Sequence, residues 1–255
     1  MEKLTVAILT KNEEKNIVNV VRNAKQVADD VLIIDSGSTD QTVALAETNG
    51  ARVVYRAWDN DFAAQRNFAL KNTNAEWILY LDADERLNDR LINSIKKVVI
   101  DATEKQYSIK RKSIAFGKEF SYGVLKPDFV PRLFKKENVY WINKVHEKPI
   151  CKHSLELLDG YIEHYTYTSW GQWLDKFNQY TSIWAIDNYK KGKNVTIIGA
   201  FTHSIFGFLQ MLILKRGILD GSMGFILCIM HFFYTLMKYL KLINLQRKKR
   251  DNLGD

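Results

Sequence analysis

An apolar run leads directly into three carboxylates in the stretch WILYLDADERL, residues 77–87. The carboxylates of Asp82, Asp84 and Glu85 repel one another, and an apolar strand is a poor place to solvate them. Two carboxylates one residue apart, just past the end of a strand, can both reach one hard cation such as Mg²⁺ or Mn²⁺. Asp82 and Asp84 are therefore candidate metal ligands. We assign Glu85 to the first turn of the next helix, where acidic side chains are favoured.

Polar side chains also follow two earlier apolar runs of the chain. TKNEE begins at Thr10 and contains Asn12 and Glu13, and VLIIDSGSTDQT continues from its apolar run into Asp35 and Ser36. A carboxylate at a strand end can accept hydrogen bonds from a ribose or a base edge, and a Gly/Ser loop brings backbone N–H groups close to a ligand. Asn12 or Glu13 could equally cap the next helix. These clusters indicate a nucleotide site, with helix capping as the alternative for part of them.

The elements that must position these residues alternate between strands and helices. The apolar patterns predict strands at 4–9, 31–35, 51–55 and 77–81, and helices at 13–28, 40–49, 62–73 and 88–101. Such alternation is typical of a mostly parallel sheet covered on both faces, in which ligands bind at the carboxyl ends of the strands. Arg66 lies on the helix before the acidic strand, where its guanidinium could pair with a diphosphate or with the acidic cluster.

The rest of the chain is predicted to form two further regions. Residues 105–168 alternate and are rich in aromatic side chains, which indicates mixed strands and loops that close one edge of the sheet. From residue 169 the chain is predicted to be helical, with an aromatic stripe for which core packing is favoured over sugar stacking. That stripe contains Trp170, Trp173, Tyr180 and Trp184. The predicted division is a catalytic domain at 1–168, made of halves 1–102 and 103–168, and a helical region at 169–255.

Two apolar segments near the C-terminus indicate contact with a membrane surface. Residues 199–214 and 223–237 are each shorter than the ~20 residues that span a bilayer, and a basic cluster follows them. An in-plane position on anionic lipid accounts for both features, and a buried helical hairpin is the alternative. The basic cluster consists of Lys238, Lys241, Arg247, Lys248, Lys249 and Arg250.

Composition and short motifs disfavour a protein with a signal peptide and a dinucleotide-dependent oxidoreductase. The chain has 255 residues, a formal net charge of +8 and 46% hydrophobic residues, which is ordinary for a globular protein. Its two cysteines, Cys151 and Cys228, lie far apart with no metal-ligand spacing, as expected of a reduced intracellular protein. The N-terminal residues are expected to form a strand and not a signal peptide. No G-x-G-x-x-G follows the first strand, which disfavours a dinucleotide-dependent oxidoreductase.

The four motifs VAILTKNEE, VLIIDSGSTDQT, AAQRNFAL and WILYLDADE resemble, in this order and spacing, the nucleotide-sugar-binding half of family 2 glycosyltransferases. The resemblance covers residues 4–86. It implies an α/β protein with a GT-A fold, a Rossmann-like mixed sheet with a helical C-terminal extension. It also implies a UDP-sugar donor and a divalent cation, Mg²⁺ or Mn²⁺, held by Asp84 and Asp82. The donor-binding residues implied in this way are Thr10, Asn12, Glu13, Asp35, Ser36, Arg66, Asp82 and Ala83.

The second half of the chain resembles a narrower group. RLFKKENVYWINKVHEKP, IEHYTYTSWGQWLDKFNQY and KRGILDGSMGF are similar to the lipopolysaccharide and lipooligosaccharide inner-core β-1,4-glucosyltransferases. These enzymes transfer glucose from UDP-glucose to an inner-core heptose. The resemblance implies a lipid-linked core oligosaccharide as acceptor, and a cytoplasmic protein peripheral to the inner face of the inner membrane. Acceptor-facing residues implied for this acidic substrate are Arg132, Arg216 and Asp220.

The catalytic base is the point where the chain departs from the family pattern. Many members carry a Glu-Asp pair there, whereas this chain has His146-Glu147. Glycosyl transfer from a nucleoside diphosphate needs one group that takes the proton of the acceptor hydroxyl, and a single displacement inverts the anomeric centre. We assign that role to Glu147, with His146 orienting it or contacting the donor phosphate, and Asp128 as the reserve candidate.

Two alternative functions remain open at this point. One is a transferase of the same fold that uses another UDP-sugar or a polyprenyl-phosphate acceptor. The other is a basic module that binds nucleotides or nucleic acid without catalysis, for which the basic cluster at the C-terminus is the main support. The resemblance favours the transferase, and no nucleic acid partner is expected.

Overall fold

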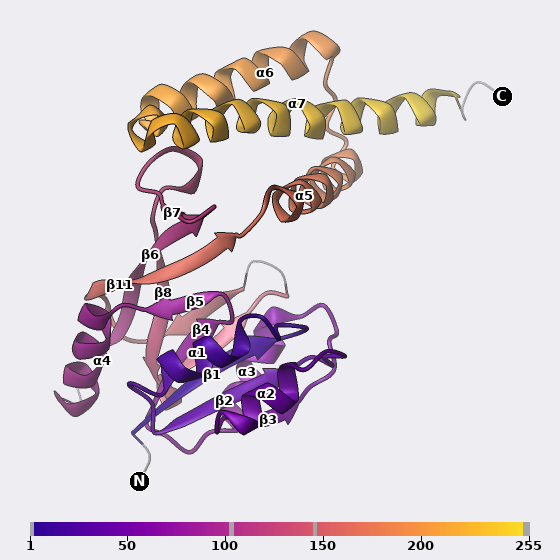
Figure 1. Cartoon of the computed structure of the whole chain (residues 1–255). Coiled ribbons are helices and arrows are strands. Elements are labelled where there is room, and N and C mark those ends of the chain that lie inside the picture. The colour runs from indigo at the N-terminus through magenta and orange to yellow at the C-terminus, as the bar shows by residue number, and fades with distance from the viewer. Residues whose placement is uncertain (1–2, 102–104, 145–146, 252–255) are drawn as a thin grey trace. The chain divides into compact units, whose positions relative to one another are not determined.

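The computed structural model describes residues 3–101, 105–144 and 147–251, with side chains up to Arg247. The described part contains a nine-stranded sheet with the order β3-β2-β1-β4-β8-β6-β11-β5, and β7 pairs with β6 (Figure 1). The strands of this sheet are β1 (Leu4–Thr10), β2 (Asp30–Asp35), β3 (Arg52–Tyr55), β4 (Trp77–Asp82), β5 (Glu85–Leu87), β6 (Gln106–Ala115), β7 (Lys118–Glu119), β8 (Asp128–Lys135) and β11 (Leu155–Tyr167). A separate antiparallel pair is formed by β9 (Val139–Ile142) and β10 (Lys148–Cys151).

The helices alternate with the first four strands and then dominate the C-terminal part. They are α1 (Ile17–Ala24), α2 (Thr42–Thr48), α3 (Phe62–Lys71), α4 (Asp89–Asp101), α5 (Trp170–Lys190), α6 (Ile197–Leu209) and α7 (Gly221–Asp251). The mixed α/β sheet and the helical C-terminal region confirm the predicted fold class.

The parallel strands bring the polar clusters to one edge of the sheet. Strand β1 pairs in parallel with both β2 and β4, so that Thr10 lies opposite Asp35 and Leu9 lies opposite Asp82. The carboxyl ends of these strands therefore meet, as the sequence pattern predicts. Strand β8 pairs with β4 in the antiparallel sense and continues the sheet on the other side.

The two faces of the sheet are covered by different helices because strand side chains alternate. On one face Val6 and Ile8 of β1 pack with Ile17 and Val20 of α1, in a cluster that also includes residues of α2 and α4. On the other face Ala7 belongs to a cluster with residues of α3 and β9. The strands β1, β2 and β4 are buried on both faces, which is why they read as continuous apolar runs.

One local prediction is wrong. Glu85 does not start a helix, because it is the first residue of the short strand β5, and helix α4 begins only at Asp89. Its side chain is fully buried. Strand β5 pairs with β11, with Glu85 opposite His164. Long-range pairing with a strand some 80 residues later overrides the local helix signal, as is common for such signals.

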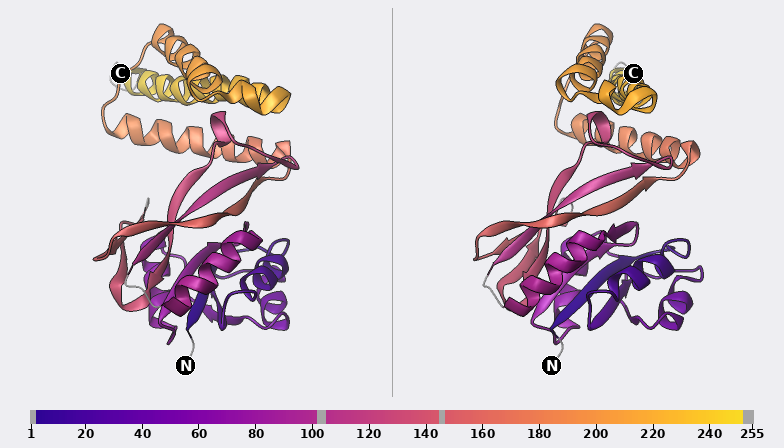
Figure 2. Two further views of the ribbon diagram at one scale, coloured as in Figure 1. Left: turned by 90° about the vertical axis from the view of Figure 1, so that its left-hand side faces the viewer. Right: turned by 60° about the vertical axis from the view of Figure 1, so that its left-hand side comes forward.

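The chain divides into two compact units. Unit 1 consists of residues 1–112 and 128–165, and unit 2 of residues 113–127 and 166–255. The segment 113–127, which sequence analysis assigned to the catalytic domain, thus belongs to unit 2. Within unit 2, α7 packs against both α5 and α6 (Figures 1 and 2).

Unit 2 leaves large apolar side chains exposed. On and just after α6, the exposed fraction is 77% for Ile198, 63% for Phe206 and 70% for Leu214. Two segments, Ile197–Leu214 and Gly217–Arg247, are long and apolar enough to cross a membrane by length and composition, and only 11% of the first is buried. Segments this apolar and this exposed are unusual in a monomeric soluble protein.

Candidate functional site

A buried ion network occupies the end of strand β4. The Nη2 atom of Arg132 donates to Asp82 Oδ2 at 2.6 Å and to Glu85 Oε1 at 2.8 Å. Glu85 Oε2 accepts the backbone N–H of Asp82, and Arg111 donates to Glu85 Oε1 at 3.2 Å. Arg132 is 4% exposed, so its charge is balanced almost entirely by these carboxylates. The arginines of this network compensate the negative charges of Asp82 and Glu85.

The network also fixes the charge of Asp82. Burial alone would raise the pKa of the Asp82 carboxyl, but the guanidinium groups of Arg132 and Arg66 outweigh burial and hold that pKa well below its usual range. In the same way, burial opposes the positive charge of Arg132, and Asp82 and Glu85 raise its pKa above the ordinary value. Asp82 is thus ionised at any physiological pH and is already paired.

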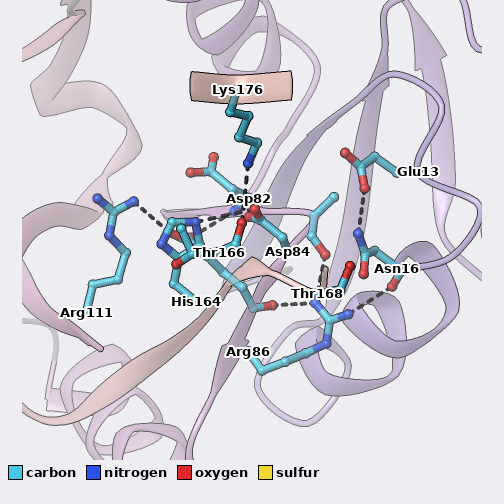
Figure 3. A network of polar contacts seen from close by, with 12 residues as sticks. Glu13, Asn16, Asp82, Asp84, Arg86, Arg111, His164, Thr166, Thr168 and Lys176 are labelled. Atoms are coloured by element: carbon cyan, nitrogen blue, oxygen red, sulfur yellow. Dashed lines mark hydrogen bonds and ion pairs between the residues drawn. The ribbon is translucent and has the colours of Figure 1, made fainter. Parts of the chain in front are cut away.

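Asp84 has a different environment from Asp82. Its Oδ2 atom lies 3.3 Å from Nε2 of His164, and the two side chains are 30% and 20% exposed (Figure 3). Among the described residues of unit 1, no arginine or lysine forms an ion pair with Asp84, so its carboxylate keeps capacity for a further cation. The two members of the D-x-D pair therefore differ: Asp82 is built into the protein's own charge network, and Asp84 faces an imidazole.

Arg86 fixes the loop that carries Asp84. Its guanidinium donates to the carbonyl oxygens of Ala83 and Glu85, and to that of Asn16 at the start of α1 (Figure 3). Burial lowers the pKa of Arg86, against the opposing effect of neighbouring acids such as Asp84. These bonds join the β4–β5 turn to α1 and hold the Asp84 backbone in place.

A cavity of about 280 Å³ opens beside the acidic turn. Its wall includes Glu13, Arg66, Asp82, Ala83, Asp84 and Glu147. Arg66 is 5% exposed and donates to Glu147 Oε1 at 3.2 Å, while its Nη1 atom has no hydrogen-bond partner among the described residues. Its guanidinium also lies over the ring of Trp141, 4.8 Å from the centroid. A buried guanidinium with a spare donor is suited to a phosphate oxygen.

A second cavity of about 260 Å³ shares part of this wall. It is lined by Thr10, Ser36, Trp58 and Gln65, and by Leu9, Glu13 and Phe62, which also line the first cavity. The two cavities therefore adjoin, and together they combine an aromatic and polar compartment with an acidic one. This combination fits a base and ribose next to a diphosphate.

Two residues predicted to bind the donor shape the loop around this compartment. Asp35 is 3% exposed, and its Oδ2 accepts the backbone N–H groups of Gly37 and Ser38 at 2.8 Å each. Asn12 has a positive φ of 56°, and its Oδ1 accepts the backbone N–H of Thr39. Gly37 has a φ of 89°, which suits glycine. These hydrogen bonds fix the form of the loop beside the cavity that Thr10 and Ser36 line, and donor binding by Asp35 and Asn12 stays a prediction.

The remaining predicted catalytic and acceptor residues lie in several places. His146 lies outside the described residues. Asp128 forms a two-point ion pair with Arg111, which outweighs burial and lowers the pKa of Asp128. Arg132, predicted to face the acceptor, is buried in the network of Asp82 and Glu85.

Arg216 and Asp220, also predicted to face the acceptor, belong to unit 2. Asp220 is 7% exposed and accepts the backbone N–H groups of Ser121 and Tyr122, so its carboxylate holds a turn. Arg216 precedes the short helix 217–220 with a φ of 56°.

Sequence reasoning missed two functional candidates, His164 and Arg111. Both come from strands in the second half of the chain, and pairing between distant strands brings them to the acidic turn. His164 was visible only as a lone histidine in IEHYTY, and Arg111 as one of several basic residues in KRK. Both residues lie too far from the D-x-D pair in the sequence for a local pattern to connect them with it.

Comparison with known proteins agrees with this geometry. Residues 5–146 match the family model described as glycosyl transferase family 2. An uncharacterized glycosyltransferase of Rickettsia typhi is 30% identical over 98% of this chain and 90% of its own length. The SPbeta prophage-derived glycosyltransferase SunS of Bacillus subtilis is 30% identical over 60% of this chain and 36% of its own length.

Among solved structures, glucosyl-3-phosphoglycerate synthase from Mycobacterium tuberculosis, in complex with Mn²⁺, UDP and glucosyl-3-phosphoglycerate, is 19% identical. The match covers 53% of this chain and 57% of that chain, with a TM-score of 0.40. The family match spans the polar strand ends β1, β2 and β4 and the D-x-D turn. With its mixed GT-A sheet and this site, the chain belongs to glycosyl transferase family 2.

Proposed function

We propose that the protein is a metal-dependent, inverting hexosyltransferase that moves a sugar from a UDP-sugar donor to a lipid-linked glycan. The finer assignment, glucose from UDP-glucose onto an inner-core heptose of lipopolysaccharide or lipooligosaccharide, rests on the resemblance of the second half of the chain. The observation that carries the proposal is one cavity wall on which Asp84, Arg66 and Glu147 lie together. A carboxylate with spare capacity, a spare guanidinium donor and a second carboxylate are the groups that this reaction needs.

Asp84 and His164 are the residues that would hold the divalent cation. Adjacent ligands of an octahedral ion with bonds of about 2.1 Å lie about 3 Å apart, close to the 3.3 Å between Asp84 Oδ2 and His164 Nε2. An imidazole ligand favours Mn²⁺ over Mg²⁺, because nitrogen is a softer ligand than oxygen. When bound, the cation supplies charge neutralisation of the diphosphate leaving group. Asp82 supports the site from the buried network, in place of the direct metal contact predicted from sequence.

The chain's own cations assist the leaving group. Arg66 offers Nη1 to a phosphate oxygen, and its position between Glu147 and Asp82 keeps it fixed without a bound substrate. A donor that is fixed before the reaction costs little reorganisation when negative charge develops on the diphosphate. Thr10 and Ser36, from the adjoining cavity, serve the nucleoside.

Glu147 is the proposed base. It lines the same cavity as Asp84, and 20% of its side chain is exposed, so an acceptor hydroxyl can reach it. Asp128 is less suited to this role, because both of its oxygens accept hydrogen bonds from Arg111. The exchange of Glu147→Gln should lower turnover by about 10²–10⁴-fold and leave UDP-sugar affinity nearly unchanged. Turnover equal to that of the wild type would remove Glu147 from the role.

Membrane association accounts for the exposed helices of unit 2. Unit 2 contains 14 Lys/Arg and 6 Asp/Glu, whereas unit 1 contains 23 of each, so the formal charge of +8 belongs to unit 2 alone. Basic charge next to exposed apolar helix faces favours an anionic lipid surface. The variant Phe206→Asn should weaken flotation with phosphatidylglycerol vesicles, and Leu157→Asn, an equally exposed site in unit 1, should not. Equal flotation of both variants would contradict a membrane role for α6.

The central experiment is a donor screen with the full chain. UDP-sugars are offered with Mn²⁺, with Mg²⁺ and with a chelator, and release of UDP is measured with and without a heptose-containing core acceptor. We expect release that requires the metal and rises with acceptor, with UDP-glucose as the best donor. Absence of turnover with every UDP-sugar under all of these conditions would refute the proposed activity.

A further inference from the structure

A cavity of about 200 Å³ lies inside unit 2, between helices α5 and α7. Six aromatic or imidazole side chains line it, together with Val124 and Leu227: Tyr167, Trp173, Phe177, Tyr180, His231 and Tyr234. None of these residues belongs to the donor site of unit 1. Two residues of the aromatic stripe for which core packing was predicted, Trp173 and Tyr180, thus line a cavity.

The cavity walls are largely apolar but include the phenols of Tyr167, Tyr180 and Tyr234. Trp173 is 8% exposed, whereas Tyr180 is 49% exposed. Burial raises the pKa of the Tyr167 phenol, and the phenols of Tyr180 and Tyr234, which line the same cavity, raise it further. A ligand for this space therefore has a hydrocarbon part for the rings and a polar part for the phenols.

Two lysines flank the aromatic wall. Nζ of Lys176 lies 5.1 Å from the centroid of the Tyr167 ring, and Nζ of Lys238 lies 5.7 Å from that of Tyr234. Among the described residues of unit 2, no carboxylate forms an ion pair with either lysine. Two ammonium groups without acidic partners beside an apolar cavity favour a ligand that is both anionic and hydrophobic.

We propose that this cavity is a binding site for one hydrocarbon chain of a phosphate-bearing lipid, with the lipid phosphate held by Lys176 and Lys238. A bare phosphate would leave the aromatic rings unused. A neutral lipid would give no anionic partner to Lys176, which donates to the Thr166 carbonyl at 3.4 Å, or to Lys238, which lies over aromatic rings. The exposed apolar faces of α6 in the same unit bring the cavity to a membrane, where such a lipid is available. Lipid binding here involves no glycosyl transfer, so it stands or falls separately from the proposed function.

The test uses the full chain on phosphatidylcholine vesicles that contain a small share of photoactivatable lipid. In one arm the reactive group is on a chain of phosphatidic acid, and in the other on a chain of phosphatidylcholine. After illumination, the labelled residues are mapped by peptide mass spectrometry. We expect phosphatidic acid to label Trp173, Phe177 and Tyr234 at least about fivefold more than phosphatidylcholine does, because charge-assisted contacts to the phosphate favour it.

Two variants separate the cavity from general membrane contact. Val124→Trp fills the cavity, so label at Trp173 and Tyr234 should fall about tenfold, while label at Phe206 on α6 remains. The matched control Leu174→Trp adds the same ring at an exposed site of α5 outside the cavity and should change neither. Undiminished label at Trp173 in Val124→Trp would overturn the proposal.

The phosphate contact is tested without filling the cavity. The double change Lys176→Gln with Lys238→Gln should bring labelling by phosphatidic acid down to the level of phosphatidylcholine. Lys190→Gln with Lys191→Gln, which removes the same charge at the end of α5, should keep the preference. Equal loss in both pairs would mean that total charge attracts the lipid and would refute a site at Lys176 and Lys238.

Discussion

The two units differ in how their cationic side chains are paired. In unit 1, where acids and bases are equal in number, the buried cation Arg132 is matched by the carboxylates of Asp82 and Glu85. In unit 2, where bases exceed acids by eight, Lys241 donates only to neutral oxygens, those of Asn178, Thr181 and Ser182. Unit 1 satisfies its charges internally, as an enzyme core must. Unit 2 has an excess of positive charge and exposed apolar helix faces.

This difference in charge pairing indicates which residues are expected to bind ligands. In unit 1 the charges of Asp82, Glu85 and Arg132 compensate one another. We call these three residues the frame of the site, because they support it without needing an external ion. Groups left with spare capacity beside the frame, such as Asp84 and the Nη1 atom of Arg66, are the ones that can meet a substrate. Among the described residues of unit 2, Lys238 and Lys241 form no ion pair with a carboxylate of their own unit, so their charges differ from those of the frame.

The largest effect is expected from Asp84→Asn. Because Asp84 is a proposed ligand of the cation and lies outside the frame, transfer should fall more than about 10³-fold while the free energy of unfolding stays the same. Asp82→Asn should lower both quantities, because Arg132 then keeps only Glu85, and Arg66 only Glu147, as a carboxylate partner. Turnover assays and urea unfolding of the two variants measure the contrast. Equal loss of stability in both would show that Asp84 also belongs to the frame.

Removal of the central cation should be next in size. Arg132→Met leaves the buried Glu85 and the partly exposed Asp82 without their main partner, and we expect a loss of about 3–5 kcal/mol in the free energy of unfolding. The matched control is Arg52→Met, which breaks an ion pair with Asp30 in which Arg52 is 46% exposed, and should cost at most about 1 kcal/mol. Urea midpoints at constant slope give both values. A small cost for Arg132 would mean that the network is not closed as described.

Acidic pH should lower the free energy of unfolding of unit 1, because Asp82 of the frame becomes protonated. The folded-state pKa of Asp82 is depressed, so its contribution to stability is present above the unfolded pKa of about 4 and is lost as pH falls below that value. We expect at most about 2 kcal/mol from this carboxyl, because 35% of its side chain is exposed and solvent screens the pair. Unfolding measured from pH 6 to pH 2 should show a flatter slope in Asp82→Asn. An unchanged slope would assign acid sensitivity elsewhere.

The smallest effect is expected in unit 2. Lys241→Met removes a cation that holds no carboxylate, so the loss should be about 1 kcal/mol or less, far below that of Arg132→Met. Thr181→Val, which removes one acceptor of the same lysine, serves as the partner variant. Unfolding in urea with mild detergent measures both. A loss in the free energy of unfolding for Lys241→Met as large as that for Arg132→Met would contradict the difference in charge pairing between the two units.

Local pattern was enough for much of unit 1. Strands β1, β2 and β4 were predicted to within one residue at each end, because strands buried on both faces are continuous apolar runs bounded by polar turns. Helices were less exact, and α1 begins at Ile17, four residues after the predicted start. The position of Thr10, Asp35 and Asp82 at one edge also followed from sequence, since parallel strands align their carboxyl ends.

The separate roles of the acidic residues could not be predicted in the same way. Asp82, Asp84 and Glu85 have the same chemistry and are nearly adjacent in sequence, but one is paired with arginine, one faces histidine and one is fully buried in a strand. Asp35 presented the same difficulty, because its carboxylate turns inward to the amides of Gly37 and Ser38.

The sequence by itself determined the fold class, the polar edge of the sheet and the family, because each depends on patterns within a short segment or on several motifs in series. Only the tertiary structure decided which partner each carboxylate has, since Arg111, Arg132 and His164 come from strands and lie 26 to 80 residues away from the acids they contact. Charge pairing depends on distance in space, and strand pairing between remote segments sets that distance.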